Sequence, residues 1–183
     1  MKILFIRHGE PNYSICDERG FKGQGRDMAP LTDLGIKQAE LVSKDKNLIG
    51  SEIIVSSPYT RALQTAAIIS KNTDIDLLVE MDLHEFIPDK TFNYKGETES
   101  RLLHKDFGDC RGTYPYGETR KWETVDEIIT RVIPVIEKYK CYDKIIVVAH
   151  GGVIRRFIGL ADIEYCKVYE FDYDSNFKCH GWV

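Results

Sequence analysis

The sequence predicts an α/β fold in which helices lie on both sides of a largely parallel central sheet. Three short runs, at residues 3–6, 53–55 and 145–148, are wholly apolar and rich in β-branched side chains. Such runs are typical of strands that are buried on both faces. Helical patterns separate them, and this alternation favours a parallel sheet. A chain of 183 residues can bury a core of its own. We therefore expect one domain over residues 1–183, built as a three-layer sandwich.

Start signals predict two helices in the first half of the chain. Thr32 is a helix-capping residue type and precedes a helical pattern that runs through Leu34 to Val42. Ser57 followed by Pro58 is a second start signal, because proline is favoured at the first helical position. The helix that it predicts carries three apolar side chains on one expected face, Leu63, Ala66 and Ala67.

The second half of the chain contains the clearest helical pattern. Thr124 and Glu127 form the sequence pattern of a capping box. Apolar residues then follow at steps of three or four, at Val125, Ile128, Ile129, Val132, Ile136 and Tyr139. Pro134 lies inside this stripe and is expected to kink the helix. A last helix is expected after Gly151. A further short strand is expected over residues 76–79.

Residues 86–123 lack clear periodicity and are rich in charged, aromatic and turn-forming residues. We interpret this segment as an insertion that forms a small cap over one end of the sheet. Its aromatic residues could line a cleft or form a small core of the cap itself, and we favour the core. These residues are Phe86, Phe92, Tyr94, Tyr114 and Tyr116.

The charge balance argues against a nucleic acid or an anionic membrane as the main partner. Lys and Arg total 25 against 29 Asp and Glu, and no basic run overrides the net charge of −4. The apolar run at the N-terminus is too short for a signal peptide and meets Arg7 at once, and no transmembrane span is present. The expected location is the cytoplasm.

Cysteine and histidine spacing does not predict a metal site. None of the 5 cysteines lies within four residues of another, so the chain has no CxxC pair, and the odd number fits reduced thiols. His84, His104 and His180 show no ligand spacing among themselves. We expect neither a metal nor a cofactor.

Polar residues follow all three buried runs at the point where each expected strand ends. Arg7 and His8 follow the first run, Arg61 lies shortly after the second, and His150 follows the third. Ligands of parallel sheets bind at the carboxyl ends of the strands, so these side chains are expected to converge. Arginine forks match phosphate oxygens, and helix N-termini add partial positive charge. This pattern predicts a pocket for a dianionic phosphate within an acidic protein.

The two histidines suggest a chemistry for this pocket. Nearby arginines disfavour a protonated imidazole, so His8 is expected to be neutral with a free lone pair. A neutral imidazole beside a bound phosphate is a nucleophile that can form phosphohistidine. The reaction also needs an acid for the leaving oxygen and then a base for water, and one carboxyl group can serve as both. Glu85, just beyond the short strand expected over 76–79, is the candidate.

Four sequence blocks resemble the histidine phosphatase superfamily, which has the phosphoglycerate mutase-like fold. The blocks occur in the family order and span most of the chain: Arg7-His8-Gly9-Glu10, Leu31-Thr32-x-x-Gly35-x-x-Gln38-Ala39, Ser56-Ser57-Pro58-x-x-Arg61-Ala62-x-x-Thr65-Ala66 and His150-Gly151-Gly152-Val153-Ile154-Arg155.

This resemblance implies a role for each matching residue. His8 would be the phosphorylated nucleophile, with Glu85 as the general acid and base and His150 as the third catalytic residue. The implied phosphate-binding set is Arg7, Arg61, Ser14 and Gly151, with Ser14 standing where the family often has asparagine.

The resemblance implies a metal-independent phosphatase of the histidine acid phosphatase type, a phosphoric monoester hydrolase. A small phosphorylated metabolite is the expected substrate, and a phosphoprotein is the second candidate. A phosphoglycerate mutase would use the same pocket but add a paired arginine for the substrate carboxylate. Here Arg101, Arg111 and Arg120 occur singly, which favours hydrolysis. A third alternative is a non-catalytic member that binds phosphorylated ligands.

Overall fold

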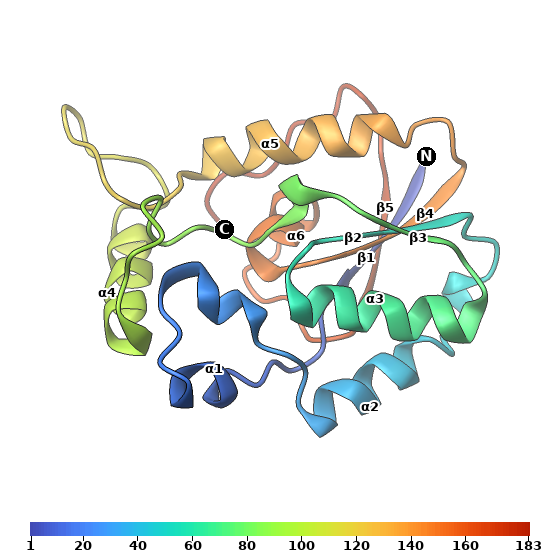
Figure 1. Cartoon of the computed structure of the whole chain (residues 1–183). Coiled ribbons are helices and arrows are strands. Elements are labelled where there is room, and N and C mark those ends of the chain that lie inside the picture. Colours follow the sequence, from blue (N-terminus) through green and yellow to red (C-terminus); the bar gives the residue numbers. More distant parts are fainter.

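The computed structural model covers residues 1–183 and is built around a five-stranded sheet with the strand order β3-β2-β4-β1-β5 (Figure 1). Four strands run parallel: β1 (Lys2–Arg7), β2 (Ile53–Ser56), β3 (Leu77–Val79) and β4 (Lys144–Ala149). The edge strand β5 (Val168–Asp172) is antiparallel to β1, and the sequence did not predict it. The three buried runs therefore form neighbouring central strands, as predicted.

Helices cover both faces of the sheet, which confirms the predicted α/β class (Figure 1). One face carries α2 (Asp33–Val42) and α3 (Thr60–Thr73). The other carries α5 (Val125–Lys138) and α6 (Gly151–Ile158). The remaining helices are α4 (Gly96–Asp109), the short α1 (Ser14–Glu18) and three 3-10 turns, η1 (Gly23–Met28), η2 (Lys46–Leu48) and η3 (Met81–Leu83).

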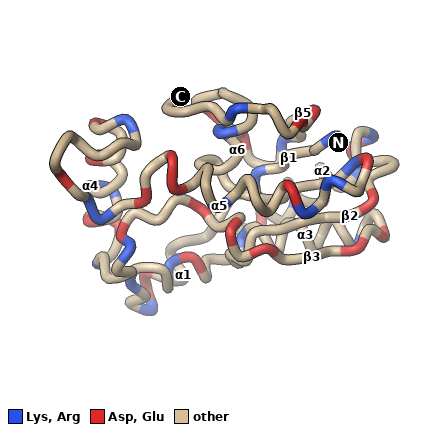
Figure 2. Tube along the Cα trace, turned by 90° about the horizontal axis from the view of Figure 1, so that it is seen from above, with Lys and Arg blue, Asp and Glu red and all other residues tan.

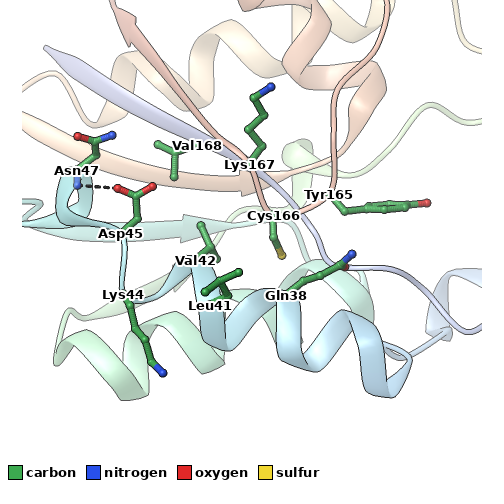
Figure 3. Close-up of a pocket in the computed structure, with 10 residues that line it drawn as sticks. All are labelled: Gln38, Leu41, Val42, Lys44, Asp45, Asn47, Tyr165, Cys166, Lys167 and Val168. Carbon is green, nitrogen blue, oxygen red and sulfur yellow. Dashed lines mark hydrogen bonds between the residues drawn. The ribbon is translucent and has the colours of Figure 1, made fainter.

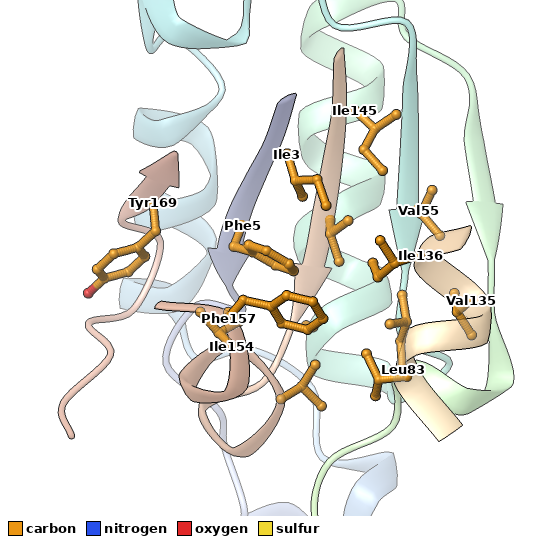
Figure 4. Close-up of a cluster of buried hydrophobic side chains, with 14 of the residues drawn as sticks. Ile3, Phe5, Val55, Leu83, Val135, Ile136, Ile145, Ile154, Phe157 and Tyr169 are labelled. Carbon is orange, nitrogen blue, oxygen red and sulfur yellow. The ribbon is translucent and has the colours of Figure 1, made fainter. Parts of the chain in front are cut away.

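Alternate side chains of the central strands fill two separate cores. Ile3 and Phe5 of β1 face α5 and α6, where they pack with Ile136 and Phe157 (Figure 4). The alternate side chains of these strands face α2 and α3 in a second cluster, which contains Leu4, Ile6, Ile54, Ile146 and Val148. Burial of both faces explains why these strands are continuous apolar runs.

The predicted capping residues of α2 and α5 are confirmed. The backbone N–H of Gly35 donates to the Thr32 hydroxyl at 2.9 Å, and Thr124 forms a complete capping box with Glu127. Because these side chains satisfy otherwise unpaired N–H groups, they define where both helices begin.

The predicted start of α3 is wrong, and of the three side chains predicted to share one face only Ala66 is buried. The helix begins at Thr60, and Ser57 is not its cap, because its hydroxyl bonds the ring of His150 instead. The buried face consists of Arg61, Ala62, Thr65, Ala66 and Ile69, whereas Ala67 is exposed and Leu63 is half-buried. The face shifts because the helix turns the polar residues Arg61 and Thr65 toward the carboxyl end of the sheet.

Residues 86–123 contain the long helix α4, which the sequence did not predict. It stands at one side of the molecule (Figure 1), and Figure 2 shows Lys, Arg, Asp and Glu interspersed along it. Of its side chains only Ser100 is buried, so the apolar period is weak. The separate aromatic core favoured for this segment is wrong: Phe86 packs on Phe107 and Tyr114 on Trp122, but all four belong to or pack against the core between the sheet, α5 and α6. Phe92 and Tyr116 are exposed and take no part in it.

Candidate active site

The ends of three neighbouring strands bring the predicted site residues to one edge of the sheet. Arg7 at the end of β1 pairs with Ala149 of β4, and Ser56 of β2 pairs with Val148. His8 and His150 therefore emerge side by side, with their ring centroids 5.1 Å apart. Arg61 reaches the same place from the first turn of α3.

His8 is held as a neutral imidazole in one tautomer. Its Nδ1 lies 2.7 Å from the carbonyl oxygen of Gly9, which only accepts, so Nδ1 carries the proton. Arg61 Nε, which only donates, lies 3.2 Å from His8 Nε2, so Nε2 presents its lone pair. Burial, followed by the charge of Arg61, holds the pKa of His8 well below its ordinary value. The ring is therefore a neutral imidazole with its Nε2 lone pair directed at the Arg61 guanidinium.

Arg61 is almost completely buried, at 2% exposed, and is held from several sides. Its Nη1 donates to the carboxylate of Asp27 at 3.0 Å. The rings of Tyr13 and Tyr59 flank the guanidinium at 5.7 and 5.1 Å. Burial raises the pKa of Asp27, and the charge of Arg61 opposes that shift. Arg61 is therefore oriented before any substrate binds.

His150 is fully buried and has one nitrogen without a partner. Its Nε2 lies 2.7 Å from the hydroxyl of Ser57, whereas its Nδ1 forms no hydrogen bond. Burial first, and then the charge of Arg61, hold the pKa of His150 well below its ordinary value. Buried polar atoms without a partner are rare, and Nδ1 is the one ring nitrogen of His150 that is free to bond another group.

Arg7 is anchored by β1 and by the segment before β5. One of its amino groups donates to the carbonyl of Ile163 at 2.5 Å, and the guanidinium lies 4.0 Å from the centre of the Tyr165 ring. Its Nε is buried without a partner. The guanidinium therefore keeps unused donors toward the site.

Glu85 lies against the N-terminal end of α6. Its carboxylate accepts from the backbone N–H of Gly152 at 3.1 Å and from that of Phe86 at 2.8 Å. These two backbone donors fix the position of the carboxyl group. A Cβ at residue 152 would lie 2.3 Å from Glu85 Oε1, so a side chain there would displace the carboxylate.

The second sequence block supports the loop that carries His8. The Thr32 hydroxyl donates to the carboxylate of Glu10 at 2.6 Å, and Gln38 accepts from the backbone N–H of Glu10 at 2.8 Å. Gly9 and Gly35 pack backbone against backbone, because a Cβ on Gly9 would lie 2.5 Å from the Gly35 carbonyl oxygen. The block thus sets the position of the nucleophile loop.

The structure brings together all the predicted site residues except Ser14. His8, His150, Arg7, Arg61, Glu85 and Gly151 lie around one spot. Ser14 is exposed at the start of α1 and bonds Asn12, whereas the neighbouring Tyr13 lines the site cavity.

Sequence reasoning missed three residues that hold the site together. Asp27 pairs with Arg61, Ser57 bonds His150, and Tyr165 lies under Arg7. The position of Ser57 directly after a buried strand was a usable signal, because the other site residues occupy equivalent positions. Asp27 and Tyr165 lie in segments without such a pattern.

A cavity of about 370 Å³ opens beside Arg61 and Glu85 and is walled by α4. It gives a bound molecule access to both of these side chains. Its lining includes Tyr13, Asp27, Tyr94, Glu97, Arg101 and His104.

A larger hollow of about 500 Å³ lies between α2 and β5, away from the histidines (Figure 3). Its charged lining is limited to Lys44, Asp45 and Lys167. It is therefore not the catalytic site.

No group of three or more His, Cys, Asp and Glu side chains is arranged to hold a metal ion. None of the helices has both the length and the apolar character needed to cross a bilayer.

Together the fold and this cluster define an α/β protein built to hold a phosphoryl group. The family model of the histidine phosphatase superfamily, branch 1, matches residues 3–176. The chain belongs to this superfamily.

The relatives include proteins named as phosphatases and as mutases. "Uncharacterized phosphatase PhoE" of Bacillus subtilis is 28% identical over 167 residues, covering 85% of this chain and 75% of that protein. "Probable phosphoglycerate mutase GpmB" of Proteus mirabilis is 24% identical, covering 100% and 90%. The structure of a mycobacterial glucosyl-3-phosphoglycerate phosphatase superposes with a TM-score of 0.71 at 20% identity, covering 99% of this chain and 97% of that one. This structural similarity confirms the predicted fold.

Proposed function

We propose that this protein is a metal-independent phosphoric monoester hydrolase that acts on a small phosphorylated metabolite through phosphohistidine at His8. The observation that carries the proposal is the pair of hydrogen bonds on the His8 ring. Nδ1 donates to Gly9, and Nε2 faces a guanidinium that can hold the phosphoryl oxygens. A neutral, oriented imidazole next to a phosphate-binding arginine is what nucleophilic attack on phosphorus requires.

In the first step the lone pair of His8 Nε2 attacks phosphorus, and the bond to the ester oxygen breaks. Arg7 and Arg61 stabilise the charge on the phosphoryl oxygens. His150 donates to them from Nδ1 while its Nε2 accepts from the Ser57 hydroxyl. Glu85, as the carboxylic acid, gives its proton to the leaving oxygen.

In the second step water replaces the imidazole on phosphorus. The Glu85 carboxylate takes a proton from the attacking water, the P–Nε2 bond breaks, and its electron pair returns to His8. Phosphate leaves, and Glu85 is again an acid. One carboxyl group at the start of α6 thus serves both steps.

A panel of phosphate esters assayed in the presence of EDTA tests this proposal. Hydrolysis that persists with the chelator and disappears in His8→Ala supports it. Full activity of His8→Ala would contradict it.

Phosphoglycerate mutase activity is the second candidate function, and it is favoured by the match to the Proteus mirabilis relative over 201 residues. A mutase returns the phosphoryl group to an acceptor instead of to water. A coupled assay for 2- and 3-phosphoglycerate interconversion separates the two. Interconversion much faster than hydrolysis would reverse our ranking.

A further inference from the structure

The Glu85 carboxylate is placed by backbone groups and by no side chain. It accepts from the N–H groups of Phe86 and Gly152. The chain around it, which we call the acid loop (residues 82–87), has no regular secondary structure beyond Leu83, where η3 ends. The position of the carboxylate therefore depends on what holds the backbone of the acid loop.

Arg131 of α5 holds the acid loop at two backbone carbonyls. Its Nη1 donates to the carbonyl of Asp82, and its Nη2 donates to the carbonyl of Glu85 at 3.4 Å. Arg131 lies next to the buried face of α5, where Ile128 and Val132 are each 1% exposed. The acid loop is thus tied to a helix that is fixed in the core.

Glu123 completes the support from the other end of the segment 86–123. Its carboxylate accepts from Arg131 Nε at 2.6 Å and from Arg131 Nη2 at 3.0 Å. The same carboxylate accepts from the N–H of Ile87 at 3.2 Å, and the Ile87 carbonyl accepts from the Glu123 N–H at 2.9 Å. The pair therefore holds the acid loop at residues 82, 85 and 87.

The ion pair of Arg131 and Glu123 differs from every other ion pair in the chain. Its side chains are 12% and 6% exposed, and no other pair has both side chains so deeply buried. The cost of removing two charges from water offsets most of their attraction, so such a pair adds little net stability over an apolar pair. What it adds is direction, because a planar guanidinium donates along fixed lines to several acceptors at once.

We infer that Arg131 and Glu123 are positioning residues for the general acid and base, and that together they hold the backbone so that the Glu85 carboxyl group meets the leaving oxygen. Neither residue lines the site cavity, so both act through Glu85. The inference rests on the proposed function, in which Glu85 gives its proton to the leaving oxygen.

Two phosphate esters that differ in their need for an acid test the inference. Phenyl phosphate releases a poor leaving group that gains from protonation, whereas 4-nitrophenyl phosphate releases a good one that leaves as an anion. The ratio kcat/KM covers the steps up to this release. A misplaced acid therefore lowers kcat/KM for phenyl phosphate selectively, whereas general damage to the site lowers it for both esters.

Arg131→Met is the informative variant. It should lower kcat/KM for phenyl phosphate by about 10-fold to 100-fold, and it should leave kcat/KM for 4-nitrophenyl phosphate within about threefold of the wild-type value. The control is Arg120→Met, which removes another ion-paired arginine of the segment 86–123 that does not contact the acid loop. This control should leave both values unchanged. A loss in Arg131→Met that is not larger for phenyl phosphate, or the same selective loss in Arg120→Met, would overturn the inference.

A double variant covers the case in which Arg131→Met does not fold. Glu123→Leu combined with Arg131→Met replaces the buried ion pair by an apolar pair, which is often neutral for stability. The folded double variant should show the same selective loss for phenyl phosphate. A wild-type ratio between the two esters would show that the pair does not position Glu85.

Nuclear magnetic resonance separates this inference from the proposed function. The Gly152 N–H donates to the Glu85 carboxylate, so its amide signal reports the position of the carboxylate without any turnover. The signal should move in the folded variant that lacks Arg131 and stay in place in Arg120→Met. An unmoved signal refutes the positioning role even in an active phosphatase. A moved signal in a protein that hydrolyses neither ester supports the positioning role and counts against the proposed function alone.

Discussion

The edge of the sheet that carries His8 and the segment 86–123 that carries α4 are built in opposite ways. His8, Arg61 and His150 are at most 3% exposed, and each is held by a defined partner. In α4 only Ser100 is buried, and ion pairs such as Arg101 with Glu97 lie in water, where they contribute little. The sheet edge positions the side chains of the proposed chemistry, while α4 walls the cavity beside Arg61 and Glu85.

The largest expected effect comes from removing the central arginine. Arg61→Met takes away the donor that faces His8 Nε2 and leaves the half-buried Asp27 carboxylate without its partner. We expect kcat/KM to fall by about 10²–10³-fold or more. Steady-state kinetics of the folded variant measures this. A loss no greater than that of Arg101→Met would mean that the two regions do not differ as described.

Gly152→Ala tests the position of Glu85 without touching its charge. The added methyl group would lie 2.3 Å from Glu85 Oε1, so the carboxylate must move. We expect kcat to fall by about 10²-fold, the range of general acid–base catalysis. Gly181→Ala is the matched control, because a Cβ there meets nothing within 4 Å. Wild-type kcat in Gly152→Ala would show that Glu85 acts elsewhere or not at all.

The buried neutral histidines predict a pH dependence of stability. The pKa values of His8 and His150 are well below 6.5 in the folded chain, so the unfolded chain binds more protons below that pH. Their stabilisation is therefore present above 6.5 and is lost as the pH falls toward the folded values. Urea unfolding from about pH 7.5 to 5 should show a slope of up to about 1.4 kcal/mol per pH unit for each histidine. His8→Asn should reduce that slope, and an unchanged slope would contradict the burial of a neutral His8.

The smallest effect is expected on the outer face of α4. Leu102 is 63% exposed, so Leu102→Ala should lower the free energy of unfolding by less than about 0.5 kcal/mol. Phe157→Ala, in the core beneath the sheet edge and 1% exposed, should cost about 3–5 kcal/mol. Chemical denaturation of both variants compares the two regions directly. Similar losses would show that α4 is as tightly integrated as the sheet.

This contrast also explains how far the sequence could predict the structure. The central strands were readable because burial on both faces demands unbroken apolar runs, as in residues 3–6. Most of the site followed, because parallel strand ends necessarily meet at one edge. Helix α4 could not be predicted from the sequence, because a surface helix that buries little area has only a weak periodicity of apolar residues.

The contacts that join distant segments could not be read from local patterns. Asp27 reaches Arg61 from a 3-10 turn, and Tyr165 meets Arg7 from the segment before β5. Ser57 was assigned to a helix cap by its neighbour Pro58, whereas tertiary structure uses its hydroxyl for His150. Such contacts depend on how the loops pack together, which no single stretch of sequence encodes.

The most direct test of the account is to trap the phosphorylated enzyme. Rapid acid-free quenching during turnover of a radiolabelled phosphate ester should leave label on the protein that is stable to alkali and lost in acid, as a phosphoramidate is. The label should map to the peptide that contains His8 and be absent from His8→Ala. Label that survives acid, or that persists in His8→Ala, would contradict the assignment of His8 as the nucleophile.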